Sequence, residues 1–144
     1  MRYAYMNRKR SEATEQERVV NYCRYNEMRY PELKLLHHIP NGGRRDKKEA
    51  ARLKAQGVKA GVPDLFLPVP RQGFYGLYIE MKYGENKTTQ SQRFWLEELK
   101  KQGFKTVVCY GADAAIKEID EYMNIEKIGE IGRASCRERV SSPV

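Results

Sequence analysis

The segment 77–83 constrains the fold more strongly than any other part of this chain. Apolar and polar side chains alternate along it, which is the pattern of a β-strand that buries one face. The apolar positions are Leu77, Ile79 and Met81, and the polar positions are Tyr78, Glu80 and Lys82. Because successive side chains of a strand point to opposite sides, Glu80 and Lys82 are expected to share one face.

A second strand is predicted over 64–69, and the intervening stretch 70–76, which contains proline and glycine, indicates a hairpin loop. Asp64 opens this strand directly after Pro63. Pairing of the two strands would bring Asp64 and Glu80 to the same edge of the sheet, with Lys82 beside them. From the spacing alone, the alternative is a surface Glu–Lys pair and an aspartate that only caps a turn.

Two carboxylates and an amine around one point suit phosphodiester chemistry. Carboxylate oxygens bind hard divalent cations such as Mg²⁺, and an ammonium group can orient a nucleophilic water and offset phosphate charge. The composition agrees, because 27 Lys and Arg residues against 19 Asp and Glu residues give a net charge of +8. Such an excess favours nucleic acid as the partner, although it suits a DNA-binding module without activity equally well.

The rest of the pattern predicts alternating helices and strands. Helices are predicted at 11–29, 46–56, 113–123 and from Thr88 or Thr89 to 102, and further strands at 33–39 and 104–110. Ser11 is the expected N-cap of the first helix, and Gly57 and Gly103 are expected to end the second and third helices. This order favours an α/β fold in which a mixed central sheet is covered by helices.

The length of 144 residues fits one domain, predicted over 11–127, with a basic arm at 1–10. The Ser- and Arg-rich stretch 128–144 is expected to be disordered or foreign to the native product. The three cysteines are far apart and lack metal-binding spacing, which favours a reduced, cytoplasmic setting. No apolar run reaches the roughly 18 residues that a membrane span needs, so no membrane association is expected.

Two further groups of candidates have competing interpretations. An acid of the first helix could complete the metal site, but acids in a first turn also complement the helix dipole. The three acids are Glu12, Glu15 and Glu17. His37 and His38 are adjacent, so on a strand they would point to opposite faces and could not chelate one metal together. A structural role is therefore favoured for the two histidines.

A glycine-containing basic loop at 41–48 is a candidate phosphate-binding surface. Its possible DNA contacts are Arg44, Arg45, Lys47 and Lys48, with Lys59 further along. The alternative is a solvated loop without a partner. The loop lacks the GxxxxGK[ST] pattern, so no nucleotide cofactor is predicted.

Three segments together resemble the VRR-NUC family, a branch of the PD-(D/E)xK nuclease superfamily. They are 57–64, which ends in Pro63-Asp64, then 79–82, which reads Ile-Glu-Met-Lys, and 89–92, which reads Thr-Gln-Ser-Gln and precedes Trp95. The resemblance covers about 11–123 and is greatest to small stand-alone members of the phage type. It implies a restriction-endonuclease-like fold and phosphodiester hydrolysis that depends on Mg²⁺ or Mn²⁺.

The resemblance also implies roles for individual residues. The implied catalytic set is Glu12, Asp64, Glu80, Lys82 and Gln92. Within that set Lys82 would be the catalytic lysine and Gln92 a supporting glutamine. The implied metal ligands are Asp64, Glu80 and the backbone carbonyl of Met81. Ser11-Glu12 matches the start of the family pattern best, so the resemblance favours Glu12 over Glu15.

For function, the resemblance implies a homodimer that cleaves Holliday junctions and leaves 5′-phosphate and 3′-hydroxyl ends. Such an enzyme would act in the cytoplasm of a bacterial or phage-infected cell. Two alternatives remain open from the residues. One is a nuclease for linear or flapped DNA in repair or restriction, and the other is a DNA-binding module whose catalytic site is vestigial.

Overall fold

The computed structural model describes residues 8–41 and 45–125. Its elements, in chain order, are α2 (Glu12–Asn26), the 3₁₀ helix η1 (Pro31–Leu35), β1 (His37–His38), α3 (Lys47–Ala55), β2 (Leu65–Leu67), β3 (Leu77–Lys82), α4 (Gln90–Lys101), β4 (Lys105–Tyr110) and α5 (Ala112–Met123). This order confirms the predicted α/β class.

The four strands form one mixed sheet in the order β1-β2-β3-β4. β2 pairs antiparallel with both β1 and β3, so the predicted hairpin between β2 and β3 is confirmed. β4 lies parallel to β3, and α4 makes the crossover between them. A parallel pair needs such a connection, because the chain must return to the starting end of the sheet.

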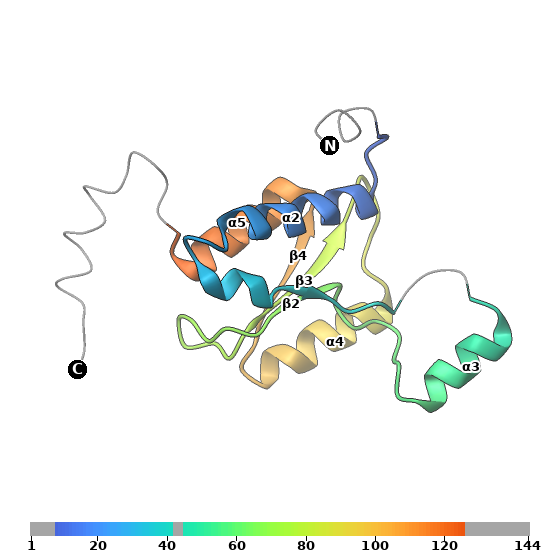
Figure 1. Ribbon diagram of the computed structural model, residues 1–144. Coiled ribbons are helices and arrows are strands. Elements are labelled where there is room, and N and C mark those ends of the chain that lie inside the picture. Colours follow the sequence, from blue (N-terminus) through green and yellow to red (C-terminus); the bar gives the residue numbers. More distant parts are fainter. Residues whose placement is uncertain (1–7, 42–44, 126–144) are drawn as a thin grey trace, which may run out of the picture.

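Helices cover both faces of the sheet, with α2 and α5 on one side and α4 on the other (Figure 1). The apolar positions of β3 are completely or almost completely buried and belong to one core with Val19 of α2 and Ile119 of α5. On the opposite face, the Oγ1 of Thr106 donates a hydrogen bond to the backbone carbonyl of Leu96 in α4, 3.2 Å away. Thr106 is the register partner of Tyr78, so the polar face of β3 is the face on the α4 side.

The capping residues explain where the helices begin and end. Ser11 caps α2 and Thr89 caps α4, each by accepting a hydrogen bond from the backbone N–H three residues later. Gly57 and Gly103 follow α3 and α4 with positive φ angles of 100° and 94°, as expected for glycines that end helices. α2 ends at Asn26, three residues before its predicted end.

The strand predicted over 33–39 is confirmed only at its C-terminal end, in β1 (His37–His38). Pro31–Leu35 is a 3₁₀ helix instead, and only His37 and His38 pair with β2. Proline favours the first turn of a helix because its φ angle is already helical and it has no N–H to bond. The fold then buries Leu33 under α2, which an extended strand at the sheet edge would not do.

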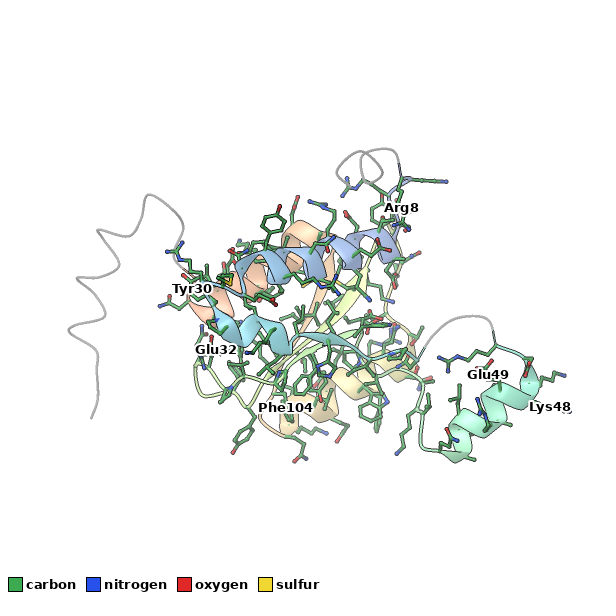
Figure 2. All side chains as sticks on the ribbon, in the orientation of Figure 1. Arg8, Tyr30, Glu32, Lys48, Glu49 and Phe104 are labelled. Atoms are coloured by element: carbon green, nitrogen blue, oxygen red, sulfur yellow. The ribbon has the colours of Figure 1, made fainter. Side chains whose placement is uncertain are left out.

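α3 differs from the other helices because it contains no buried residue. It projects away from the layered body, on the side where α4 begins (Figure 1). Figure 2 shows Lys48 reaching outward from this helix. The helix therefore forms an arm beside the sheet, which we call the α3 arm and define as residues 45–60.

Most of the predicted N-terminal arm and the whole of the predicted tail at 128–144 lie outside the described residues, as does Arg44. Within the described part of the chain, no helix is long and apolar enough to cross a membrane.

Candidate active site

Asp64 and Glu80 are brought together by the register of β2 and β3. Leu65 pairs with Ile79, so Asp64, one residue earlier, stands opposite Glu80, one residue later. The side-chain oxygen Oδ2 of Asp64 accepts a hydrogen bond of 2.8 Å from the backbone N–H of Met81. The hairpin thus places both carboxyl groups at one edge of the sheet, on the face expected from the alternation.

Asp64 is also held through its own backbone. Its carbonyl oxygen accepts a hydrogen bond from the Ile39 N–H at 2.8 Å and another from Nδ1 of His38 at 2.7 Å. The ring of His38 therefore supports the strand that carries Asp64. His37, by contrast, donates from Nδ1 to the Leu35 carbonyl at 3.0 Å. Both histidines are exposed, and these contacts agree with the structural role that was favoured for them.

Glu80 and Lys82 are buried, with 1% and 6% of their surface exposed. Lys82 Nζ lies 3.5 Å from Glu80 Oε1. The second carboxylate oxygen, Glu80 Oε2, is fully buried and has no hydrogen-bond partner among the described residues. Burial and the nearby charge of Asp64 raise the pKa of Glu80 to about 8, although Lys82 pulls it down. A buried acid of this kind is costly for a fold unless it has a function or a bound ion.

Glu12 is the acid of the first helix that lies at this site. Burial raises the pKa of Glu12, the charge of Lys82 lowers it, and the charge of Asp64 raises it. These interactions connect the first residue of α2 with the strand ends that carry Asp64 and Lys82. The carboxyl groups of Glu12, Asp64 and Glu80 therefore share one electrostatic environment around Lys82.

Glu15 has a different position and a different set of partners. It is completely buried and forms ion pairs with Arg10 and with Arg18, the latter at 2.9 Å. Burial alone would raise the pKa of Glu15, but the hydrogen bonds from both arginines outweigh it and lower the pKa. Arg18 also binds Asp113 of α5 at 3.0 Å. Glu15 therefore links the start of α2 to the start of α5 through Arg18.

The donor set suits a small divalent cation. Among the described residues, no three His, Cys, Asp or Glu side chains form a complete metal cluster. Mg²⁺, however, is commonly held by one or two carboxylates and keeps several of its waters. Asp64 and Glu80 supply two carboxylates, and Glu80 Oε2 is an oxygen left without a partner by the described residues. A cation bound there would supply the positive charge that balances this buried carboxylate oxygen.

Gln92 lies at the start of α4, and its side chain is used there. Its Oε1 accepts a hydrogen bond of 2.8 Å from the Thr89 N–H, while Thr89 Oγ1 accepts one from the Gln92 N–H. This reciprocal arrangement is a capping box. Gln92 therefore caps the start of α4, and its supporting role in catalysis stays a prediction.

The basic residues predicted to bind DNA lie on the α3 arm rather than at the two carboxylates. Arg45 is half-buried, and the other three described candidates, Lys47, Lys48 and Lys59, are exposed.

Two residues near the site were not predicted from the sequence. Arg10 lies over the ring of Tyr83, 5.6 Å from its centroid, and Tyr83 directly follows Lys82. Nothing in the spacing of Arg10 and Tyr83 indicates this contact.

The chain is similar to known proteins of one domain family. The sequence model of the VRR-NUC domain matches residues 4–113. A solved structure named "VRR_NUC domain protein" is 32% identical, has a TM-score of 0.69, and the match covers 83% of this chain and 93% of that chain. No curated protein is significantly similar to this chain.

Proposed function

This chain belongs to the VRR-NUC domain family, whose function is of the nuclease type, and we propose that it is a metal-dependent DNA endonuclease specific for branched DNA. The observation that carries the proposal is the unpartnered oxygen of Glu80. It is buried opposite Asp64 and beside the amine of Lys82. A fold gains no stability from such an arrangement, whereas a hydrolytic site needs it.

Asp64 and Glu80 would hold the cation, with the Met81 carbonyl as a third ligand. When bound, Mg²⁺ or Mn²⁺ supplies Lewis-acid stabilisation of the charge that develops on the phosphate oxygens. The Lys82 ammonium can orient the attacking water and offset phosphate charge from the same face of β3. Water adds to phosphorus and the bond from phosphorus to the 3′ oxygen breaks, which leaves a 5′-phosphate and a 3′-hydroxyl.

Branched DNA is proposed as the substrate together with a homodimer. A four-way junction has symmetric strands, and a two-fold dimer would present one site to each of two strands. The excess of 27 basic over 19 acidic residues suits the high phosphate density near a branch. A single copy of the described fold offers one such site.

The test compares three substrates in the presence of Mg²⁺: a four-way junction, a flapped duplex and a plain duplex of the same sequence. The proposal expects the junction to be cut fastest. Equal rates on all three would remove the specificity for branches and favour the nuclease for linear or flapped DNA. Tight binding without cleavage of any of them would favour a DNA-binding module with a vestigial site.

The dimer needs its own measurement, because a monomer could still be a nuclease. Light scattering at the concentrations used for cleavage should give twice the mass of 16.8 kDa. A mass of one chain, at concentrations where junctions are cut, would contradict the paired-site account while leaving the chemistry in place.

A further inference from the structure

The α3 arm is strongly basic and has little to hold it in place. Residues 45–60 contain six lysines and arginines against two acids. The helix itself has nine residues, none of them buried. Isolated helices shorter than about 12–15 residues are marginally stable in water. An arm of this kind is expected to gain its order from a partner that neutralises its charge.

A pocket of about 610 Å³ lies at the root of this arm. Its walls combine basic and apolar side chains, and the lining residues are Asn41, Arg45, Ala50, Leu53, Lys54, Val58, Lys59 and Ala60. The volume is in the range of pockets that bind small organic ligands. The basic side chains of the pocket would be enough to bind a phosphate group alone. Leu53 and Val58 add a half-buried apolar floor, which suits a ligand that also has an apolar part.

The inner wall of the pocket is fixed to the body of the protein. Trp95 Nε1 donates a hydrogen bond of 3.0 Å to the Ala60 carbonyl, and the Asn41 side chain donates one of 2.8 Å to the Val62 carbonyl. Gly61 packs so closely on α4 that an added Cβ would lie 2.6 Å from the backbone of Ser91. The segment 60–62 is thus held against α4, while Ala50, Leu53 and Lys54 of α3 supply the facing wall of the pocket.

The pocket is close to the candidate active site along the chain. Ala60 precedes Asp64 by four residues, and a chain of four residues spans at most about 14 Å. One strand of duplex DNA rises about 3.4 Å per nucleotide. A strand that places its scissile phosphate at Asp64 could therefore reach the pocket within about four nucleotides.

We propose that this pocket binds one unpaired nucleotide of the DNA, with its base on Leu53 and Val58 and its phosphate among Arg45, Lys54 and Lys59. The inference rests on the proposed nuclease function, because it assumes DNA at Asp64. It adds a reason for preferring branched DNA, since unstacking a base costs least where pairing is already interrupted. A second copy of this chain is a poorer occupant, because it would bring the same positive excess to a basic surface.

Fluorescence of 2-aminopurine tests the proposal without any need for cleavage. The base brightens when it leaves the stack, and none of the eight lining residues is aromatic, so none would quench it by stacking. The Lys82→Ala protein is mixed with junctions that carry the probe at the branch or about ten base pairs away, beyond the reach estimated above. We expect brightening at the branch only, and its loss in a Lys82→Ala, Leu53→Ser double variant.

Salt dependence of binding tests the phosphate part of the same pocket. Lys54→Ala and Lys59→Ala should each reduce the slope of log K against log salt by about one unit. Lys100 is an exposed lysine near the end of α4, and Lys100→Ala is the matched control, in which the fluorescence response should stay intact and the salt slope should fall less than in the two pocket variants. Alanine also preserves the α3 helix, which circular dichroism can check.

The outcomes separate the pocket from the nuclease proposal. Suppose that junctions are cleaved. A probe that stays dark at the branch would then overturn the nucleotide pocket alone, and so would brightening that survives Leu53→Ser. Brightening that depends on Leu53, together with a wild-type protein that never cleaves DNA, would overturn the nuclease function while supporting the pocket. An unchanged salt slope in both lysine variants would also contradict the pocket.

Discussion

At the scale of the residue, the placement of Glu80 is the most informative feature of the molecule. The alternation along 77–83 predicted its face, and the hairpin predicted its neighbour Asp64. Neither pattern could predict that Glu80 would be almost fully buried with one oxygen unpartnered among the described residues. That property depends on how the folded chain packs around Glu80, and the spacing of residues in the sequence does not report such packing.

Glu80 should make the stability of the protein depend on pH. Its pKa is raised to about 8 in the fold, first by burial, from an ordinary value of 4.5. Between these values the folded protein keeps a proton that the unfolded chain releases, so stability falls as pH rises. Below pH 4.5 the effect is absent, and above about pH 8 it is complete.

Glu80→Gln stays neutral and should escape this loss. Urea unfolding with a chelator present should show the variant gaining stability over the wild type as pH rises from 4.5 toward 8, and no further gain above that. The control is Glu97→Gln on the exposed side of α4, for which the difference should stay flat. A flat difference for Glu80→Gln as well would mean that the carboxyl is not buried as described.

At the scale of the element, helix boundaries were predictable wherever a capping residue marked them. Ser11, Asp46 and Thr89 each accept a backbone hydrogen bond at the start of a helix. The strand expected over 33–39 was too long, because apolar residues next to Pro31 suit a short helix as well as a strand. Tertiary burial of Leu33 decides between them, and no local pattern reports it.

Gly61 is the point at which the segment leading to Asp64 meets α4, and its substitution should be costly. Gly61 and Gly57 both have positive φ angles, 94° and 100°. An alanine at Gly57 meets no atom within 4 Å, whereas one at Gly61 would lie 2.6 Å from the Ser91 backbone. Both changes bear a backbone cost of about 1–2 kcal/mol, and only Gly61→Ala adds a steric clash.

Thermal unfolding of the two alanine variants measures the difference directly. We expect Gly61→Ala to lower the melting temperature clearly more than Gly57→Ala, and to reduce activity because Asp64 is displaced with its loop. Equal melting temperatures for the two variants would show that α4 does not pack on Gly61 as tightly as the structure indicates.

At the scale of the whole molecule, the sequence predicted a layered α/β body around one sheet but not the independence of α3. The helix was expected from Asp46 and Gly57, and both signals were correct. Its separation from the body was not predictable, because an alternation of basic and small residues fits a helix on a surface as well as one in an arm. The pocket at its root is lined on one side by residues of this helix, among them Leu53 and Lys54.

A divalent cation should stabilise the whole fold if Asp64 and Glu80 hold it. At a concentration of about 100 times its dissociation constant, Mg²⁺ would add roughly 2.7 kcal/mol to the free energy of unfolding. The melting temperature should therefore rise with Mg²⁺ or Mn²⁺ and fall again with a chelator. Asp64→Asn should lose most of this shift, and a shift of the same size in that variant would place the ion elsewhere.

The most direct test of the account is the rate at which the protein cleaves a four-way junction in Mg²⁺ under single-turnover conditions. We expect Asp64→Asn and Lys82→Ala each to lower this rate by roughly 10²-fold or more, and Lys100→Ala to leave it unchanged. Retention of the wild-type rate by either site variant, in a protein that remains folded, would contradict the assignment of Asp64, Glu80 and Lys82 as the catalytic centre.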